Sequence, residues 1–556
     1  MINIACISPD GAPCSVRKNA DEIMRLIHIN SKADIVLFPR LALSTAGCGD
    51  LFLQDALISA CESALKNIAA GVKDRIAVIG TPVKDGAGNL FDMAAVLHGG
   101  KVQRFVPLNS PKKPFSQDFP SVLYDIPVSR EPFILNGQNI CIDGIKQYSV
   151  CLMPSCRPYL AGDEALICDW LKASSKNCIA ALAQAGQAES STDYCHAGVC
   201  GIAINQKIEA YRGAFAKKEY CFYGGAAKSN KECILKSEPF LDKKTPYLKG
   251  DKALVLCDFI RIPAQALSLR LKRINAENII LGLSGGLDSA MALLVADRAR
   301  RILNLSLSSL NIYTLPAQGT GKATLSNAEM LCNALNIPLN SIDISQAVFD
   351  HLKAINHKGQ EDAAFENAQA RERTQILMDI ANMLSGIMIG TGDMSELALG
   401  FTTYGGDHMS MYGVNSGLLK TMIRFAVHNE AQKNDRLKPA LSAILNTPIS
   451  PELKSGAQHT EKILGPYILN DFFLYYALKG FAPEKIIKKA LSAFENEYTK
   501  EFLAARLKAF YRRFFANQFK RSCLPDGPKV TDISLSPRGE FNMPSDASPE
   551  VFLDLL

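Results

Sequence analysis

The sequence has no run of 18 apolar residues, no two cysteines separated by two residues, and little net charge for its length. The first absence predicts that no transmembrane helix is present. The second argues against zinc ribbons and thioredoxin-like redox motifs, although the chain contains 16 cysteines. A net charge of +6 over 556 residues also argues against nucleic acid as the main partner.

The N-terminus also lacks the features of a targeting segment. Residues 1–7 have no basic stretch and no long apolar core, so we expect a first strand there, not a signal peptide. The cysteines are expected to be reduced and mostly buried thiols, as in proteins of a reducing compartment. These expectations together predict a cytoplasmic protein that does not use a membrane.

The length and the alternation of patterns predict two large α/β domains. Residues 1–245 alternate strand-like apolar runs, such as 35–38 and 76–79, with stretches of helical periodicity. A polar segment at residues 242–251, broken by proline and glycine, indicates a linker, which is expected at residues 246–262. Residues 263–556 form the second expected domain, in which helices predominate after about residue 420.

A glycine-rich turn at residues 281–290 carries the clearest functional signal. It follows an apolar run and precedes a helical stretch, a layout in which backbone N–H groups at a helix N-terminus bind phosphate. Ser284 and Ser289 add hydroxyl donors, and Asp288 can hold Mg²⁺ against the phosphates. The turn contains no lysine and matches neither the dinucleotide nor the P-loop motif. An ordinary tight turn between a strand and a helix is the alternative interpretation.

A second strand-like run, residues 387–389, leads into another glycine-rich turn at residues 390–400. Ligands of open α/β sheets bind beyond the carboxyl ends of the strands, so both turns are expected to face one crevice. Asn367 and Arg371 are four residues apart in an expected long helix and share one of its faces. Alternatively, Arg371 and Glu396 are surface charges on helices.

These motifs, with residues 403–407, 415–421, 465–474 and 527–539, resemble those of NAD synthetases, and the last ones resemble the long, glutamine-dependent form. The resemblance covers residues 263–556. It implies a doubly wound parallel sheet of the adenine-nucleotide α-hydrolase type. It also implies ATP-dependent amidation of nicotinic acid adenine dinucleotide (deamido-NAD) to NAD through an adenylylated intermediate, with Mg²⁺ as cofactor and AMP and pyrophosphate as products.

The resemblance assigns roles position by position. It implies that ATP is bound by Ser284, Gly285, Gly286, Asp288, Ser289 and Thr391. It implies Mg²⁺ ligation by Asp288 and Glu396, and catalytic roles for Asp288 and Lys420. The residues implied to contact deamido-NAD or the adenylate are Asn367, Arg371, Glu396, Lys420 and, as a weaker candidate, Lys529.

The N-terminal half resembles the nitrilase-type amidase domain of the long synthetases, through residues 33–39, 49–52 and 186–193. A nitrilase-like α/β sandwich is implied. That family uses a Cys nucleophile, a Glu base and a Lys that stabilises the oxyanion. This sequence has Arg40 at the Glu position and Leu108 at the Lys position. Depending on the alignment, Met153 or Cys151 stands at the nucleophile.

These substitutions predict an inactive amidase domain, because arginine is no general base at neutral pH and leucine offers no donor. Lys112 or Lys113 could replace the lost cation but not the lost Glu. The synthetase half would then take nitrogen from ammonia. The alternatives are a glutamine-hydrolysing synthetase with an unusual glutaminase site, a nucleotide-binding pseudo-enzyme, and an amidase acting on another amide. The long relatives also imply a homo-oligomer.

Overall fold

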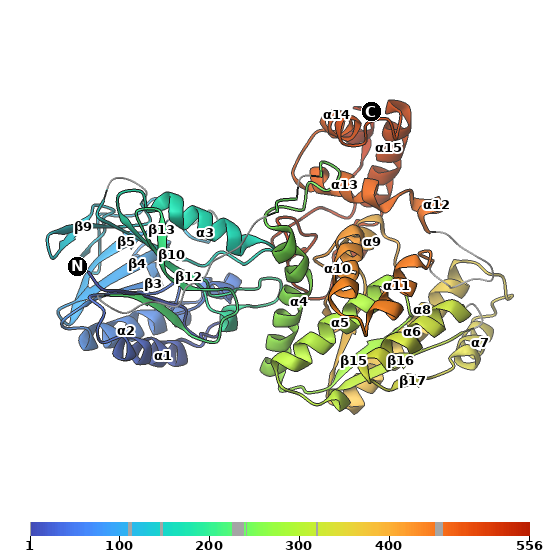
Figure 1. Ribbon diagram of the computed structural model, residues 1–556, viewed down its shortest axis with the longest axis horizontal. Helices are drawn as coiled ribbons and strands as arrows, with labels where there is room; N and C mark the ends of the chain where they lie inside the picture. Colours follow the sequence, from blue (N-terminus) through green and yellow to red (C-terminus); the bar gives the residue numbers. More distant parts are fainter. Residues whose placement is uncertain are drawn as a thin grey trace. The chain divides into compact units, whose positions relative to one another are not determined.

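The computed structural model describes residues 2–108, 114–144, 148–224, 238–240, 242–317, 321–450 and 460–556. Lys112 and Lys113, proposed above as replacement cations, lie outside these described residues. The chain forms two compact units, Met1–Ser237 and Glu238–Leu556, whose elements are labelled in Figure 1. Each unit is described by itself.

The first unit contains two six-stranded sheets of mixed strand direction. In spatial order, the strands of one sheet are β14 (Tyr220–Tyr223), β1 (Ile4–Ile7), β2 (Ile35–Leu37), β3 (Ile76–Lys84), β4 (Leu90–His98) and β5 (Lys101–Pro107). Those of the other are β13 (Lys207–Arg212), β12 (Cys200–Ile204), β11 (Ile179–Gln184), β10 (Val150–Ser155), β9 (Gln138–Ile142) and β8 (Phe133–Leu135). A short hairpin is formed by β6 (Val122–Leu123) and β7 (Ile126–Pro127).

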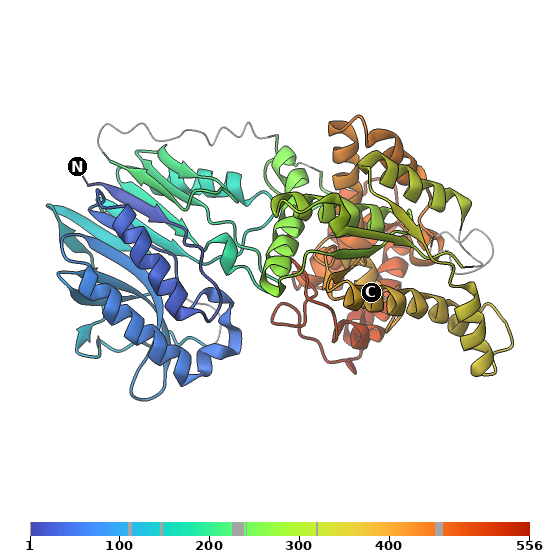
Figure 2. The same cartoon turned by 90° about the horizontal axis from the view of Figure 1, so that it is seen from below.

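The two sheets of the first unit pack face to face. Alternate residues of their strands, such as Ile4 and Leu37 from one sheet and Val150 and Ala181 from the other, form one buried cluster. Helices α1 (Val16–Ile29) and α2 (Asp55–Gly71) cover the outer face of the first sheet, where they lie side by side (Figure 2). Helix α3 (Asp163–Ser174) covers the second sheet. The result is the predicted nitrilase-like α/β sandwich.

The second unit is built on a five-stranded sheet in which every pairing is parallel. Its strands in spatial order are β17 (Leu339–Ser341), β16 (Leu310–Thr314), β15 (Ile279–Gly282), β18 (Ile387–Gly390) and β19 (Tyr412–Gly413). The central strands β15 and β18 are almost fully buried, as parallel strands covered on both faces require.

Helices cover both faces of this sheet, so the predicted doubly wound architecture is confirmed. The described helices of the second unit, including those away from the sheet, are α4 (Lys252–Ile274), α5 (Leu287–Ile302), α6 (Lys322–Leu335), α7 (Ser345–Ala354), α8 (Ala363–Met383), α9 (Met394–Leu399), α10 (Lys420–Lys433), α11 (Lys438–Asn446), α12 (Thr460–Leu464), α13 (Tyr467–Leu478), α14 (Pro483–Ala493), α15 (Lys500–Ala516), α16 (Gln518–Arg521) and α17 (Glu550–Leu553). Helix α8 packs on one face and α5 on the other, and α10 and α11 pack in turn against α5.

The strand order places a topological switch between β15 and β18, because the chain leaves these neighbouring strands toward opposite sides. The glycine-rich turns at residues 281–290 and 390–400 follow these two strands. Both turns therefore lie at the carboxyl edge of the sheet, where a ligand crevice is expected.

Two features of the chain differ from the sequence-based expectations. Residues 252–262, expected to belong to a linker, form the first half of α4, and Pro263, where the second domain was expected to begin, lies inside this helix. The division into residues 1–245, 246–262 and 263–556 otherwise stays a prediction. Most cysteines of the described chain are free and buried, as expected, whereas Cys168 is disulfide-bonded. Within the described residues, no helix is long and apolar enough to cross a membrane.

Candidate active site

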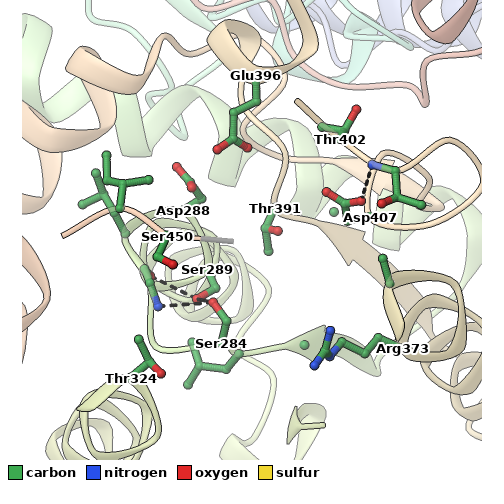
Figure 3. Close-up of a pocket in the computed structure, with 18 of the residues that line it drawn as sticks. Ser284, Asp288, Ser289, Thr324, Arg373, Thr391, Glu396, Thr402, Asp407 and Ser450 are labelled. Carbon is green, nitrogen blue, oxygen red and sulfur yellow. Dashed lines mark hydrogen bonds between the residues drawn. The ribbon is translucent and has the colours of Figure 1, made fainter. Parts of the chain in front are cut away.

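The serine side chains of the turn between β15 and α5 form hydrogen bonds within the turn. The Gly286 N–H donates to Ser284 Oγ at 3.2 Å, and Ser289 Oγ donates to the Gly286 carbonyl oxygen at 3.0 Å. The two hydroxyl oxygens lie 3.1 Å apart. Their side chains face the same space at the N-terminus of α5 (Figure 3). The turn thus presents hydroxyl and backbone donors to an anion, as the sequence predicts.

Gly285 is required by the backbone of this turn. Its φ of +84° is in the left-handed region, and an added Cβ would lie 1.8 Å from the Thr324 carbonyl oxygen in α6. Only glycine allows the turn to pack against α6 in this conformation. Gly285 therefore allows the anion-binding turn to pack closely against α6.

The turn after β18 supplies acidic side chains through α9. Asp393 caps this helix, since its Oδ1 accepts the Glu396 N–H at 2.9 Å. Ligand oxygens of Asp288, Asp393 and Glu396 all lie within 4.8 Å of one another. Sequence reasoning selected Asp288 and Glu396 and missed Asp393, although an aspartate before a helix is a recognisable N-cap signal.

Lys420, the first residue of α10, binds all three carboxylates. Its Nζ lies 2.6 Å from Asp288 Oδ2, 2.6 Å from Asp393 Oδ2 and 2.8 Å from Glu396 Oε1. The Lys420 side chain is 2% exposed and that of Asp393 is 0% exposed. Two residues predicted to be catalytic, Asp288 and Lys420, are therefore in direct contact.

The charges of this cluster are unbalanced. Burial raises the pKa of Asp288 to about 7, although Lys420 opposes this shift, and burial raises the pKa of Glu396 well above its usual value. Burial alone would lower the pKa of Lys420, but the three carboxylates raise it well above its usual value. Three carboxylates sharing one ammonium reach neutrality when two of them are protonated or when a dication is bound.

The donor set fits a divalent cation such as Mg²⁺. Carboxylate oxygens are the ligands this ion prefers, and Mg²⁺ is usually held by one or two carboxylates together with substrate phosphates. Asp288 Oδ1 is buried and has no hydrogen-bond partner among the described residues. Asp288 and Glu396, with Asp393 as a third candidate, are therefore the residues that would hold the ion.

These groups border a cavity of about 590 Å³, large enough for a nucleotide. Ser284, Asp288, Ser289, Thr391 and Glu396 line it, as Figure 3 shows. Asn367 in α8 lines it too, and its Oδ1 accepts a hydrogen bond from Thr403 Oγ1 at 2.8 Å. The polar lining residues to which the sequence analysis assigned no role include Arg373, Thr402, Asp407 and Ser450.

Three residues predicted to contact the substrate, Lys420, Arg371 and Lys529, lie outside this lining in the described part of the chain. Lys420 instead lines a second cavity, which shares Leu287 and Thr447 with the first. Arg371 donates from Nε to the Tyr404 carbonyl oxygen at 3.1 Å. Lys529 forms an ion pair with Glu540 at 2.6 Å. Their predicted contacts with deamido-NAD remain predictions, whereas Arg373, two residues along α8, faces the cavity directly.

In the first unit, Arg40 forms a buried ion pair. Its Nη2 lies 2.5 Å from Asp92 Oδ2 and its Nε 3.0 Å from the same oxygen. The Asp92 side chain is 1% exposed, and burial raises its pKa to about 6 against the effect of Arg40. The backbone N–H of Leu108 donates to the Asp92 carbonyl oxygen at 3.0 Å. An acid thus adjoins the predicted lysine position, and a cation occupies the predicted glutamate position.

Neither predicted nucleophile position faces this ion pair with a thiol. Met153 is buried within β10, paired with Leu182 of β11. Cys151 accepts a hydrogen bond from the Cys141 thiol at a sulfur–sulfur distance of 3.3 Å. Leu108 is buried in the core between the two sheets.

Sequence reasoning missed the thiol that does lie near Arg40. Cys156, the residue after β10, packs against the hydrophobic cluster that contains Phe38 and Met93, the neighbours of the Arg40 and Asp92 segments. It interacts electrostatically with both Asp92 and Arg40, and burial followed by Asp92 raises the pKa of its thiol to about 12.

Comparisons with known proteins agree with this geometry. Residues 260–516 match the family model described as NAD synthase. A glutamine-dependent NAD(+) synthetase of Mycobacterium leprae is 30% identical over 96% of this chain and 95% of its own length. The corresponding protein of Aquifex aeolicus is 25% identical over 96% of this chain and 97% of its own length.

Solved structures share the fold over the whole chain. A glutamine-dependent NAD(+) synthetase from Cytophaga hutchinsonii superposes with a TM-score of 0.81 at 19% identity, covering 100% of this chain and 99% of that one. The enzyme from Acinetobacter baumannii, solved in complex with ADP, gives a TM-score of 0.68 at 19% identity and covers 97% of both chains. With a full-length relative at 30% identity, the chain belongs to the glutamine-dependent NAD(+) synthetase family.

Proposed function

We propose that the second unit converts deamido-NAD to NAD at the cavity beside the Ser284 turn, with ATP adenylylating the nicotinate carboxylate. The observation that carries the proposal is the cluster of Asp288, Asp393, Glu396 and Lys420, of which Asp288 and Glu396 line that cavity. A carboxylate is a poor acyl donor until one of its oxygens becomes a good leaving group. Transfer of AMP to it, with release of pyrophosphate, supplies that leaving group.

The residues of the cavity have complementary parts in this step. The Ser284 and Ser289 hydroxyls and the N-terminus of α5 bind the phosphates, and Gly285 and Gly286 allow the close approach. Bound Mg²⁺ would neutralise phosphate charge as pyrophosphate leaves. We assign to Lys420, which pairs with Asp288 and Glu396 of the lining, the role of offsetting negative charge that develops on the adenylate. Thr391 and Asn367 line the same cavity and would orient the nucleotide or the dinucleotide.

The full-length relatives favour glutamine as the nitrogen source over ammonia. The sequence alone predicts ammonia, with glutamine as the alternative. Glutamine use requires a thiol, a base and a donor for the oxyanion. Cys156, Asp92 and Arg40 together offer these three groups. Asp92 Oδ1 is buried and has no hydrogen-bond partner among the described residues, so it is free to accept a proton.

The step would proceed by attack of Cys156 Sγ on the side-chain amide carbon of glutamine. Asp92 accepts the thiol proton and passes it to the leaving nitrogen, which departs as ammonia. Arg40 stabilises the oxyanion of the tetrahedral intermediate. Water then cleaves the thioester and releases glutamate. Because the pKa of the Cys156 thiol is raised to about 12 and that of Asp92 only to about 6, transfer of the thiol proton to Asp92 must be coupled to the attack on the amide carbon.

A specific observation keeps ammonia as a second candidate. Arg40 and Leu108 replace the base and the cation that the sequence resemblance implies, and the Arg40 guanidinium is already paired with Asp92. If Arg40 and Asp92 stay paired with each other, the amidase unit would keep its fold but would not hydrolyse glutamine. The synthetase unit would then use free ammonia.

NAD formation from deamido-NAD, ATP and Mg²⁺ tests both candidates, with glutamine and ammonium supplied separately. Activity with either donor supports the synthetase assignment, and activity with neither overturns it. If glutamine is used, Cys156→Ala should abolish that activity and preserve the ammonium-driven one, while Cys151→Ala should preserve both. Activity with ammonium alone would overturn the glutaminase role of Cys156 and establish the inactive amidase unit.

The cell compartment and the oligomeric state of the protein are inferred from fewer observations. The free thiols in most of the described cysteines support a reducing, cytoplasmic compartment. Assembly into a homo-oligomer rests on the resemblance to the long synthetases, and measurement of the molecular mass in solution tests it.

A further inference from the structure

Asp471 is a fully buried carboxylate in α13, at 0% exposure, with both oxygens engaged. Its Oδ1 accepts a hydrogen bond from Ser395 Oγ. Its Oδ2 accepts the Thr421 N–H at 3.0 Å and the Thr421 hydroxyl at 2.7 Å. Asp471 therefore joins α9 and α10 through a third helix.

The partners of Asp471 are chain neighbours of the catalytic cluster. Ser395 directly precedes Glu396 in α9, and Thr421 directly follows Lys420 in α10. The Lys420 N–H also donates to Ser395 Oγ at 2.9 Å. The same two helix ends that meet at Asp471 thus carry the ammonium and the carboxylate that lie 2.8 Å apart.

Helix α10 needs this partner because it has no cap of its own. Leu419 occupies its N-cap position and offers no side-chain acceptor. The unbonded N–H groups of a first helical turn need an acceptor, and a carboxylate there is further stabilised by the helix dipole. Asp471 supplies that acceptor from a distant part of the chain and fixes the first turn of α10, which holds Lys420.

Thr421 receives a further contact on its other side. The Tyr247 hydroxyl lies 2.5 Å from Thr421 Oγ1. Because the Thr421 hydroxyl donates to Asp471, Tyr247 is the donor in this pair. A directed chain of hydrogen bonds therefore runs from Tyr247 through Thr421 to Asp471 and leaves Thr421 a single orientation.

We propose that Asp471 is a positioning residue for amide synthesis, which sets the Lys420 ammonium against the Glu396 carboxylate by joining Ser395 of α9 to Thr421 of α10. This inference rests on the proposed function of the second unit. It assigns Asp471 no contact with the substrate. Its effect acts through Lys420, whose place on α10 it fixes.

The test compares Asp471→Asn with Thr421→Val and Thr421→Ser in ammonium-driven NAD formation. Asparagine presents an NH₂ group to one of the two donors, and valine removes the Thr421 hydroxyl. Both variants should lower kcat about 100-fold and change KM for ATP less than threefold. Thr421→Ser should keep kcat within threefold of the wild type, because it restores the hydroxyl. Asp532→Asn is the matched control, since Asp532 pairs with Lys249 and Lys479 away from the cluster.

A second measurement separates positioning from folding. Titration with Mn²⁺ alone, followed by electron paramagnetic resonance, reports on the carboxylate cluster in each variant without catalysis. We expect weaker Mn²⁺ binding in Asp471→Asn, by at least fivefold, with thermal unfolding still cooperative. Unchanged kcat and Mn²⁺ affinity in a folded Asp471→Asn protein would overturn the proposal. Wild-type protein that binds Mn²⁺ but makes no NAD with ammonium would instead overturn the proposed function.

Discussion

The Asp288 carboxylate and the Lys420 ammonium lie 2.6 Å apart, although 132 residues separate them in the chain. Asp288 is the second residue of α5, after β15, and Lys420 is the first residue of α10, after β19. Parallel strands bring the N-termini of their following helices to one edge of the sheet, which is why such distant residues meet. The contact joins phosphate binding to the side of the cavity where acyl transfer would occur.

Replacing Lys420 by methionine should disable the synthetase unit. The change leaves the buried Asp393 and the half-buried Asp288 and Glu396 without their ammonium, and loss of one partner from a buried pair typically costs about 3–5 kcal/mol. We expect ammonium-driven kcat to fall at least 100-fold and the unfolding temperature to drop, measured by NAD assay and calorimetry. Lys433→Met, at the exposed end of the same helix, is the control. Wild-type kcat in Lys420→Met would refute the role assigned to the ammonium.

Gly285→Ala should impair nucleotide binding. The backbone there has a φ of +84°, and a Cβ would lie 1.8 Å from the Thr324 carbonyl oxygen, so the turn must move. We expect the ATP dissociation constant to rise at least tenfold, equivalent to ~1.4 kcal/mol, as measured by calorimetric titration. Gly392→Ala should bind ATP normally, because its Cβ meets only the Asp407 carbonyl oxygen at 4.0 Å. Equal affinities in both variants would contradict a specific need for glycine at position 285.

The sequence predicts the part of the site that is local in the chain. The Ser284 turn lies between a strand and a helix, and its glycines and hydroxyls can be assigned without knowing what packs on them. Lys420 differs, because nothing near it in the sequence indicates that its side chain is buried among carboxylates. Its role came only from family resemblance, since the cluster is made by three separate turns at the sheet edge.

Sequence periodicity did not predict which face of α8 borders the cavity. Asn367 and Arg371 are four residues apart and share a face, as expected. The side of α8 that borders the cavity instead runs through Asn367, Ala370, Arg373 and Leu377. Spacing identifies residues that lie on one face, but only packing against the sheet decides which face borders the ligand.

The start of α4 was within reach of sequence reasoning. Asp251 accepts the Leu254 N–H at 2.8 Å and caps the helix that begins at Lys252. An aspartate before an apolar run is a standard N-cap signal. The linker was expected instead because proline and glycine interrupt the segment around Asp251.

Arginine substitutions on α8 should separate the two faces of this helix. Arg373→Ala removes a guanidinium that lines the cavity, so KM for ATP should rise about tenfold, or ~1.4 kcal/mol. Arg371→Ala removes a hydrogen bond to the Tyr404 carbonyl oxygen outside the lining and should change KM for ATP less than threefold. Steady-state kinetics with saturating ammonium measure both. The reverse order of effects would show that the cavity-facing side of α8 has been misassigned.

Two buried groups of the first unit give its stability a pH dependence. Glu189 is 0% exposed, and burial raises its pKa to about 8 from 4.5. Burial lowers the pKa of His196 to about 4 from 6.5, and that of Asp92 is raised to about 6. At pH 6.5 the histidine is neutral in the folded chain and half protonated in the unfolded chain, so its titration weakly opposes the effect of Glu189 until about pH 7.5, whereas Asp92 is largely ionised in both states. Glu189 is then the main one of the three that still changes its protonation on unfolding.

Glu189 should make the first unit less stable as pH rises from 6.5 to 8. In this window the folded protein keeps the Glu189 proton and the unfolded chain has lost it, so each rise in pH favours unfolding. The free energy of unfolding should fall by about 2 kcal/mol across the window, as measured by denaturant titration at several pH values. Glu189→Gln, which resembles the protonated acid, should flatten this slope. Exposed Glu131→Gln should leave it unchanged, and an equally steep slope in Glu189→Gln would assign the pH dependence to another group.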